Sequence, residues 1–190
     1  MERAVKAALM GLILMSPLAQ AGAPFGLTWG ANESDIAALG VNMTRVNSAS
    51  GMASYGTARL PDGTSNARAY SLFIDADRGL QRLTMVTEPI TNDLVGEEGK
   101  QQYALMKLSL SRKYGAPLGE FEYTGNGYQV LPSDFYACLS LKDCGSWVSV
   151  FGGDNEGERV TLRLSGTTPT AGYISISYEA PGWQISQASR

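Results

Sequence analysis

The sequence contains no histidine among its 190 residues. Histidine is the usual base of Ser-His-Asp and Cys-His nucleophilic sites and a common ligand of zinc, copper and non-haem iron. These catalytic and metal sites are therefore excluded in their usual form. Glycine-rich nucleotide-binding patterns are also missing. Enzymes that use paired carboxylates, lysine, tyrosine or bound calcium are still compatible with the composition.

Cysteine is scarce, and the two present, Cys138 and Cys144, are separated by five residues. A close, even pair in an oxidising compartment predicts a disulfide, which stabilises a fold by roughly 2–3 kcal/mol. Redox-active pairs usually have two intervening residues, and a metal site would need further soft or imidazole ligands. We therefore predict a structural disulfide that closes a hairpin turn near Lys142 and Asp143, with no metal and no cofactor.

Long apolar runs are absent after the first residues of the chain. Arg3 and Lys6 precede the apolar run Ala7 to Met15, and Ala19-Gln20-Ala21 has the small-x-small pattern of a signal peptidase site. The run is shorter than the roughly 20 residues that span a bilayer. We expect residues 1–21 to be a cleaved signal peptide and the mature protein to be periplasmic. A buried N-terminal helix is the alternative.

An excess of positive charge is absent as well, since the net charge of the chain is −3. Removing Glu2, Arg3 and Lys6 with the signal peptide would make it −4. An acidic protein binds phosphate backbones and anionic lipids poorly. We therefore expect no nucleic-acid partner and no membrane-embedded segment, and the sequence leaves the oligomeric state open.

One long helix is predicted over residues 97–117. Acidic residues come first and basic residues last, as the helix dipole favours, and Gly115 and Pro117 end the helix. Gly99 is its weak position, costing about 1 kcal/mol relative to alanine. An apolar stripe at helical spacing predicts core packing, with Leu105 and Leu108 widening it; its members are Tyr103, Met106, Leu110 and Tyr114.

A shorter helix is predicted after Trp29-Gly30, where Asn32 or Ser34 can cap it. Its pattern of Gly30, Ile36, Leu39 and Gly40 resembles the opening of small bacterial envelope domains, in which a short helix precedes a β-meander. The outer-membrane assembly lipoprotein fold and the β-lactamase inhibitor protein fold are the two examples. The resemblance covers about a dozen residues.

The remaining sequence alternates as β-strands do. We predict strands near residues 55–60, 67–75, 80–87, 118–123, 135–141, 146–151, 159–165 and 173–179. The fold class is α+β, with two helices on one face of a largely antiparallel sheet. Residues 22–183 form one domain, with possible halves 25–90 and 95–183, and residues 184–190 a polar tail. This tandem of helix-plus-meander units resembles the β-lactamase inhibitor protein architecture.

Two polar loops are the candidate partner-binding sites. The loop 152–158 carries Asp154, Asn155, Glu156 and Glu158. The link 88–98 carries Asn92 and Asp93. Ordinary solvated turns, or carboxylates that favour a helix start, are the simpler interpretation. The turn from Asp75 to Gly79 has the spacing of a calcium loop but lacks the later ligands of an EF-hand.

Aromatic residues are frequent on the predicted strands, and they either pack under the helices or anchor a protein interface on an exposed sheet face. They are Tyr55, Tyr70, Tyr123, Tyr128, Tyr136, Trp147, Tyr173 and Tyr178. We expect a non-enzymatic, periplasmic protein-binding module whose partner is another envelope protein. The resemblance implies an inhibitor or immunity protein against an envelope-acting toxin or hydrolase. A carboxylate-dependent envelope hydrolase or lyase and an envelope assembly factor are the alternatives.

Overall fold

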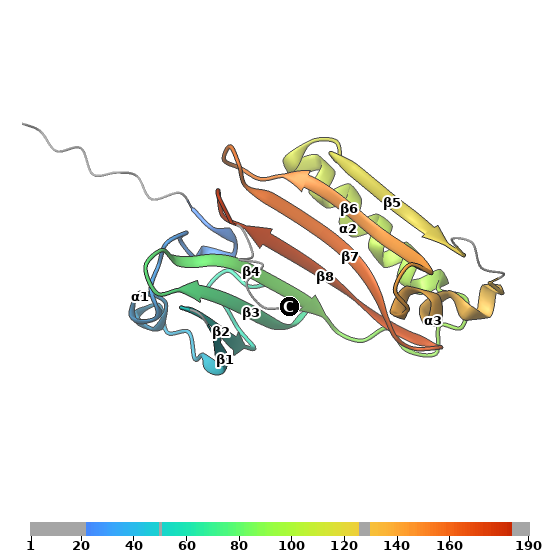
Figure 1. Cartoon of the computed structure of the whole chain (residues 1–190), viewed down its shortest axis with the longest axis horizontal. Coiled ribbons are helices and arrows are strands. Elements are labelled where there is room, and N and C mark those ends of the chain that lie inside the picture. The colour runs from blue at the N-terminus through green and yellow to red at the C-terminus, as the bar shows by residue number, and fades with distance from the viewer. Residues whose placement is uncertain (1–21, 50, 126–129, 184–190) are drawn as a thin grey trace, which may run out of the picture.

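In the computed structural model, eight antiparallel strands form one sheet in the order β1-β2-β3-β4-β8-β7-β6-β5 (Figure 1). The structure describes residues 22–49, 51–125 and 130–183, so the predicted signal peptide, the polar tail and Tyr128 lie outside it. The strands are β1 (Thr44–Ala49), β2 (Met52–Thr57), β3 (Ala67–Asp75), β4 (Gly79–Thr87), β5 (Gly119–Thr124), β6 (Gly145–Gly152), β7 (Arg159–Thr168) and β8 (Ala171–Glu179).

The strand alternation in the sequence decides which face of the sheet is buried. In β8 the side chains of Ile174 and Ile176 are buried, whereas those of Tyr173 and Ser175 on the other face are partly exposed. The same buried and exposed faces continue across the neighbouring strands, because residues that are directly opposite each other in the register share a face. The α+β fold class is therefore confirmed, with every strand pairing antiparallel.

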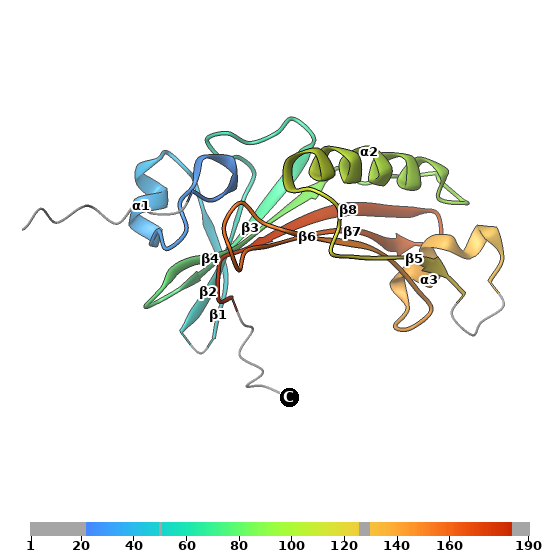
Figure 2. The ribbon, with the colours of Figure 1, turned by 90° about the horizontal axis from the view of Figure 1, so that it is seen from above.

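The sheet is assembled from two runs of four consecutive strands. Strands β1 to β4 fill one side and β5 to β8 the other, and the last strand of each run lies at the middle, where β4 pairs with β8. A helix precedes each run, α1 (Glu33–Ala38) and α2 (Glu97–Tyr114). The element order therefore repeats a helix and four strands, although α3 interrupts the second run. Figure 2 shows α1 and α2 on the same side of the sheet.

Helix α2 covers the face of the sheet formed by β6, β7 and β8. Gly96, in a left-handed conformation, precedes it, and Gly115, also at positive φ, follows it. Tyr103 and Leu110 are buried as predicted. Leu105 and Leu108 are 62% and 50% exposed, so the prediction that they widen the buried stripe is wrong. They lie on the side of the helix that points away from the sheet.

Helix α1 lies on the same side of the sheet and contacts it at β2. Asn32 caps it, accepting a hydrogen bond from the Asp35 amide at 3.0 Å, while the Asp35 carboxylate accepts one from the Asn32 amide. Ile36 is fully buried, and Glu33 accepts a hydrogen bond from the Tyr55 hydroxyl of β2 at 2.6 Å. Of the two caps predicted from the sequence, Asn32 starts the helix, and Glu33 and Ile36 attach it to the sheet.

A third helix, α3 (Phe135–Ser140), lies where a strand over residues 135–141 was predicted, so that prediction is wrong. Its aromatic run has strand propensity, but Pro132 starts a 3₁₀ turn, η2 (Pro132–Asp134), that runs directly into it. The disulfide between Cys138 and Cys144 is present and joins α3 to the start of β6. It does not close a hairpin between two strands, as the sequence suggested.

None of the helices in the described part of the chain is long and apolar enough to span a membrane.

Candidate functional site

The acidic loop between β6 and β7 is held by contacts within the molecule. The Asp154 carboxylate pairs with Lys113 at the end of α2 at 3.0 Å, and both side chains are 54% exposed. Glu158 accepts hydrogen bonds from the Trp29 indole at 2.8 Å and from the Asn155 amide at 3.1 Å. Glu156 and Asn155 are exposed. The loop is therefore a turn ordered by its own contacts, in which Glu156 stays exposed.

The second predicted loop divides between an exposed and a buried residue. Asn92 is exposed and has a positive φ of 60°. Asp93 is only 7% exposed, and its Oδ2 accepts hydrogen bonds from the Gly99 amide at 2.9 Å and the Tyr136 hydroxyl at 2.8 Å. Burial raises the pKa of Asp93, but these hydrogen bonds outweigh it and the net pKa is lowered. Asp93 therefore caps α2 with a charged carboxylate.

Gly99 is required for this arrangement. A Cβ at Gly99 would overlap the Tyr136 hydroxyl and lie 3.3 Å from Leu164. The missing side chain lets Tyr136 of α3 pass beneath the first turn of α2 and reach Asp93. The sequence marks Gly99 only as a weak helix position, because its partner is 37 residues away.

The two predicted loops lie at opposite ends of the sheet. Loop 152–158 precedes β7, whereas the Asp93 amide donates to the Thr170 carbonyl just after β7, at 3.0 Å. Strand β7 spans 10 residues, which at about 3.3 Å each separates the loops by roughly 30 Å. The structure does not bring the six candidate residues into one site.

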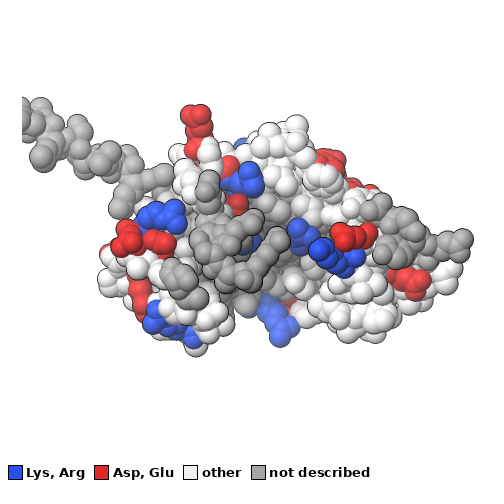
Figure 3. All heavy atoms as spheres, in the orientation of Figure 1, with Lys and Arg blue, Asp and Glu red and all other residues white. Residues whose placement is uncertain are grey.

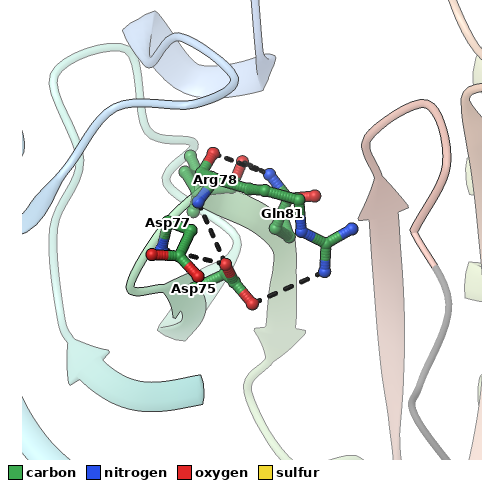
Figure 4. Close-up of polar contacts among 5 residues, drawn as sticks. Asp75, Asp77, Arg78 and Gln81 are labelled. Atoms are coloured by element: carbon green, nitrogen blue, oxygen red, sulfur yellow. Dashed lines mark hydrogen bonds and ion pairs between the residues drawn. The ribbon is translucent and has the colours of Figure 1, made fainter. Parts of the chain in front are cut away.

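The turn from Asp75 to Gly79 is closed by its own carboxylate. Asp75 Oδ1 accepts hydrogen bonds from the Asp77 and Arg78 amides at 3.1 and 3.0 Å, and Oδ2 lies 3.5 Å from the Arg78 guanidinium (Figure 4). The buried Gln81 amide donates to the Arg78 carbonyl at 2.9 Å. These contacts use the carboxylate that a calcium loop would need. Among the described residues no group of three or more Asp, Glu, Cys or His side chains could hold a metal ion.

The face of the sheet turned away from α2, which we call the open face, carries a band of hydroxyls across its middle. Register pairs align Thr161 of β7, Ser177 of β8, Thr84 of β4 and Ser71 of β3. Thr84 and Ser177 hydroxyls are hydrogen-bonded at 2.9 Å. Ser177 at the centre of the band is only 7% exposed, whereas Ser71, Thr84 and Thr161 are partly exposed.

Aromatic residues flank the hydroxyl band on both sides. On β5, Phe121 and Tyr123 are 54% and 41% exposed. On β3, Phe73 lies 6.2 Å from the Trp183 ring, and the Arg82 guanidinium lies 5.6 Å above Phe73. Half-exposed aromatic rings of this kind are typical anchors of protein interfaces.

The central strands concentrate positive charge on the open face. All charged residues of β4, β7 and β8 lie there: Arg82, Arg159, Arg163 and Glu179. Three arginines and one glutamate give these strands a net charge of +2, whereas the net charge of the whole chain is −3. Arg82 lies 3.8 Å from Glu179 and donates to Ser177 at 3.1 Å. Figure 3 shows charged side chains of both signs dispersed on this face among uncharged atoms.

The aromatic residues singled out in the sequence divide between the two faces. Tyr55, Tyr70 and Tyr178 are buried on the covered face, with Trp147 partly buried there, and Tyr136 is buried in α3. Tyr123 and Tyr173 lie on the open face. The open-face arginines were missed. The alternation of β7 contains the signal, since Arg163 lies between the buried Leu162 and Leu164.

Comparisons with protein families, with curated proteins and with solved structures found no match to this chain.

Proposed function

We propose that this protein is an exported, non-enzymatic module that binds another protein of the cell envelope through the open face of its sheet. In the sharper form of the proposal, binding inhibits an envelope-acting toxin or hydrolase. The observation that carries the proposal is the asymmetry of the sheet. Helices α1 and α2 lie on the same side of the eight strands, whereas the other face presents hydroxyls, aromatic rings and arginines.

The composition of the open face supports a protein partner. Tyr, Trp and Arg are enriched among the residues that dominate binding energy in interfaces. Tyr123, Arg163 and Tyr173 are at least partly exposed on this face, on three different strands. Short Ser and Thr side chains between them permit a partner backbone to approach closely.

The charge of the face indicates which partner surface fits. Arg159 and Arg163 are exposed on β7, and Glu179 faces Arg159 in the register. Complementary charge accelerates association and rejects unsuitable partners. The partner surface should therefore be acidic, with apolar residues placed to meet Phe121 and Tyr123.

The N-terminal sequence and the disulfide support export. Residues 1–21 have the order of a signal peptide, and the bond between Cys138 and Cys144 suits an oxidising compartment. The lack of histidine supports a role in binding rather than catalysis. The repeated helix-plus-four-strand order agrees with the resemblance to the inhibitor architecture.

Site-specific photo-crosslinking in the periplasm tests the proposal. A benzophenone amino acid would replace Ser175 on the open face or, as the matched control, Ala104 on the exposed side of α2. We expect one discrete crosslinked protein from position 175, purified with its partner in equal amounts, and none from position 104. No product at 175, or the same product from both positions, would contradict the proposal.

A further inference from the structure

A groove runs along α2 on the covered side of the molecule, away from the open face. It consists of two neighbouring cavities of about 420 and 680 Å³, which share Asn66, Met106 and Ser109. Ligand-binding clefts in proteins usually measure about 300–1,000 Å³. One side of the groove is α2, and the other side is formed by Phe25 and the loop around Asn66. Its base lies at the junction of β4 and β8.

The first cavity has an apolar base that carries one tyrosine hydroxyl. Met85, Ile176 and Tyr178 line it, and Tyr178 is only 8% exposed. Burial raises the pKa of Tyr178, so its hydroxyl is a neutral donor at physiological pH. In the described part of the chain this hydroxyl has no hydrogen-bond partner, unlike that of Tyr103, which bonds to Ser149 at 2.7 Å. The hydroxyl is not fully buried, since Arg82 Nε is the one fully buried side-chain nitrogen or oxygen without a partner among the described residues. An acceptor from a ligand in the groove can therefore reach it.

Strained backbone borders the same cavity. Phe25 has φ 61° and ψ 34°, a left-handed conformation that is unusual for an aromatic residue. Its ring packs edge-on against Tyr70 at 5.2 Å and Tyr178 at 5.6 Å. Strained residues of this kind persist where surrounding contacts hold them and cluster at ligand sites. The contacts of Phe25 hold its ring at the wall of the groove.

The charges of the groove differ between its two ends. Lys113 lines the end near the C-terminus of α2, whereas Glu88 and Glu98 line the other. Lys113 donates to the Tyr114 hydroxyl at 2.8 Å and pairs with Asp154 at 3.0 Å, which leaves one of its three donors for a ligand. Tyr178 and Lys113 line the same one of the two cavities, so the Tyr178 hydroxyl belongs to the Lys113 end of the groove.

We propose that this groove binds a free single-chain apolar carboxylate, with its carboxylate at Lys113 and Tyr178 and its chain over Met85 and Ile176 toward Met106. Charge favours this orientation. The Lys113 ammonium, although paired with Asp154, keeps one donor for the carboxylate. At the other end Glu98 and Glu88, the latter 3.8 Å from Arg68, would repel it. The apolar base and the length of the groove select a ligand with an aliphatic body.

Isothermal titration of the mature protein with dodecanoate, below its micelle concentration, tests the proposal. Saturable binding of one molecule is expected. Ser109→Trp fills the groove from α2 and should abolish binding, whereas Ala104→Trp, on the same helix but outside the groove, should leave it unchanged. Tyr178→Phe keeps the ring and should weaken binding about tenfold, because one hydrogen bond to a charged group is lost.

A second ligand distinguishes the contribution of the carboxylate to binding from that of the aliphatic chain. Lys113→Met should weaken binding of dodecanoate but leave binding of 1-dodecanol unchanged. No saturable binding by the folded wild-type protein would overturn the proposal. Equal binding by Ser109→Trp and the wild type would also overturn it, because the ligand would then bind elsewhere. The proposal does not rest on the open face, so failure of either leaves the other standing.

Discussion

The two faces of the sheet share one backbone but differ in what their side chains do. On the covered face, Leu162 and Ile176 are buried beneath α2, and the loss of either would leave a cavity. On the open face, their neighbour Arg163 is exposed and Ser175 is partly exposed. The difference teaches that burial, and with it stability, is greater on the covered face, whereas exposed residues of the open face such as Arg163 contribute little to the core.

Substitutions at adjacent residues of β7 give the largest expected difference between the faces. Leu162→Ala removes a fully buried side chain and should lower the free energy of unfolding by about 2–5 kcal/mol. Arg163→Ala, one residue later, should change it by no more than about 0.5 kcal/mol. Chemical denaturation of both variants measures this, and similar losses for the two would mean that the open face is also part of the core.

Substitution of Gly99 at the start of α2 should have a smaller effect on stability, in the direction opposite to the one that helix propensity predicts. Helix propensity predicts that Gly99→Ala stabilises by about 1 kcal/mol. Because the added Cβ would overlap the Tyr136 hydroxyl, we expect a destabilisation of about 1–3 kcal/mol instead. Thermal unfolding measures the change, and Tyr136→Phe in the same chain should recover part of it. A stabilised Gly99→Ala protein would show that Tyr136 does not pack beneath α2.

Removing the charge of Asp93 should have the smallest of these effects on the free energy of unfolding, and this effect depends on pH. Its pKa is lowered in the folded protein, so its contribution is complete above the unfolded value of about 3.9 and is lost as pH falls through the folded value. Asp93→Asn should cost about 1–2 kcal/mol at neutral pH. Urea unfolding at several pH values should show this difference shrinking below about pH 4.

Asp77→Asn is the matched control for Asp93, because Asp77 is exposed in the turn between β3 and β4. Its unfolding free energy at neutral pH should equal that of the wild type. A cost for Asp93→Asn that stayed constant down to acid pH would exclude a charged cap at the start of α2.

Much of the fold follows from local patterns in the sequence. The alternation over residues 67–87 predicts β3 and β4 with the correct buried face, and Asn32 predicts the start of α1. Local patterns were insufficient for residues 135–140, where aromatic residues with strand propensity form α3 after Pro132. Strand β1 was missed because its sequence is polar and largely exposed. Its neighbour β2 was placed too late, at residues 55–60.

The candidate sites depend on contacts that the sequence does not show. Asp93 was predicted to bind a partner, but its carboxylate accepts hydrogen bonds from the Gly99 amide and the Tyr136 hydroxyl. Tyr136 is distant in the sequence, and no local pattern around Gly99 predicts this contact. The alternation of apolar and polar residues along β7 shows that Arg163 faces away from Leu162. It does not show that β4 pairs with β8, and this pairing brings Arg82 into the same charged region as Arg159 and Arg163.

The most direct test of the open face as an interface is the affinity of the partner captured by crosslinking for two charge-reversed variants. Arg163→Glu changes the open face, and Arg112→Glu makes the same charge change on the exposed side of α2. We expect Arg163→Glu to weaken binding at least about tenfold, mainly by slower association at low salt, with Arg112→Glu close to the wild type. Loss of binding by Arg112→Glu, with Arg163→Glu unaffected, would contradict the account.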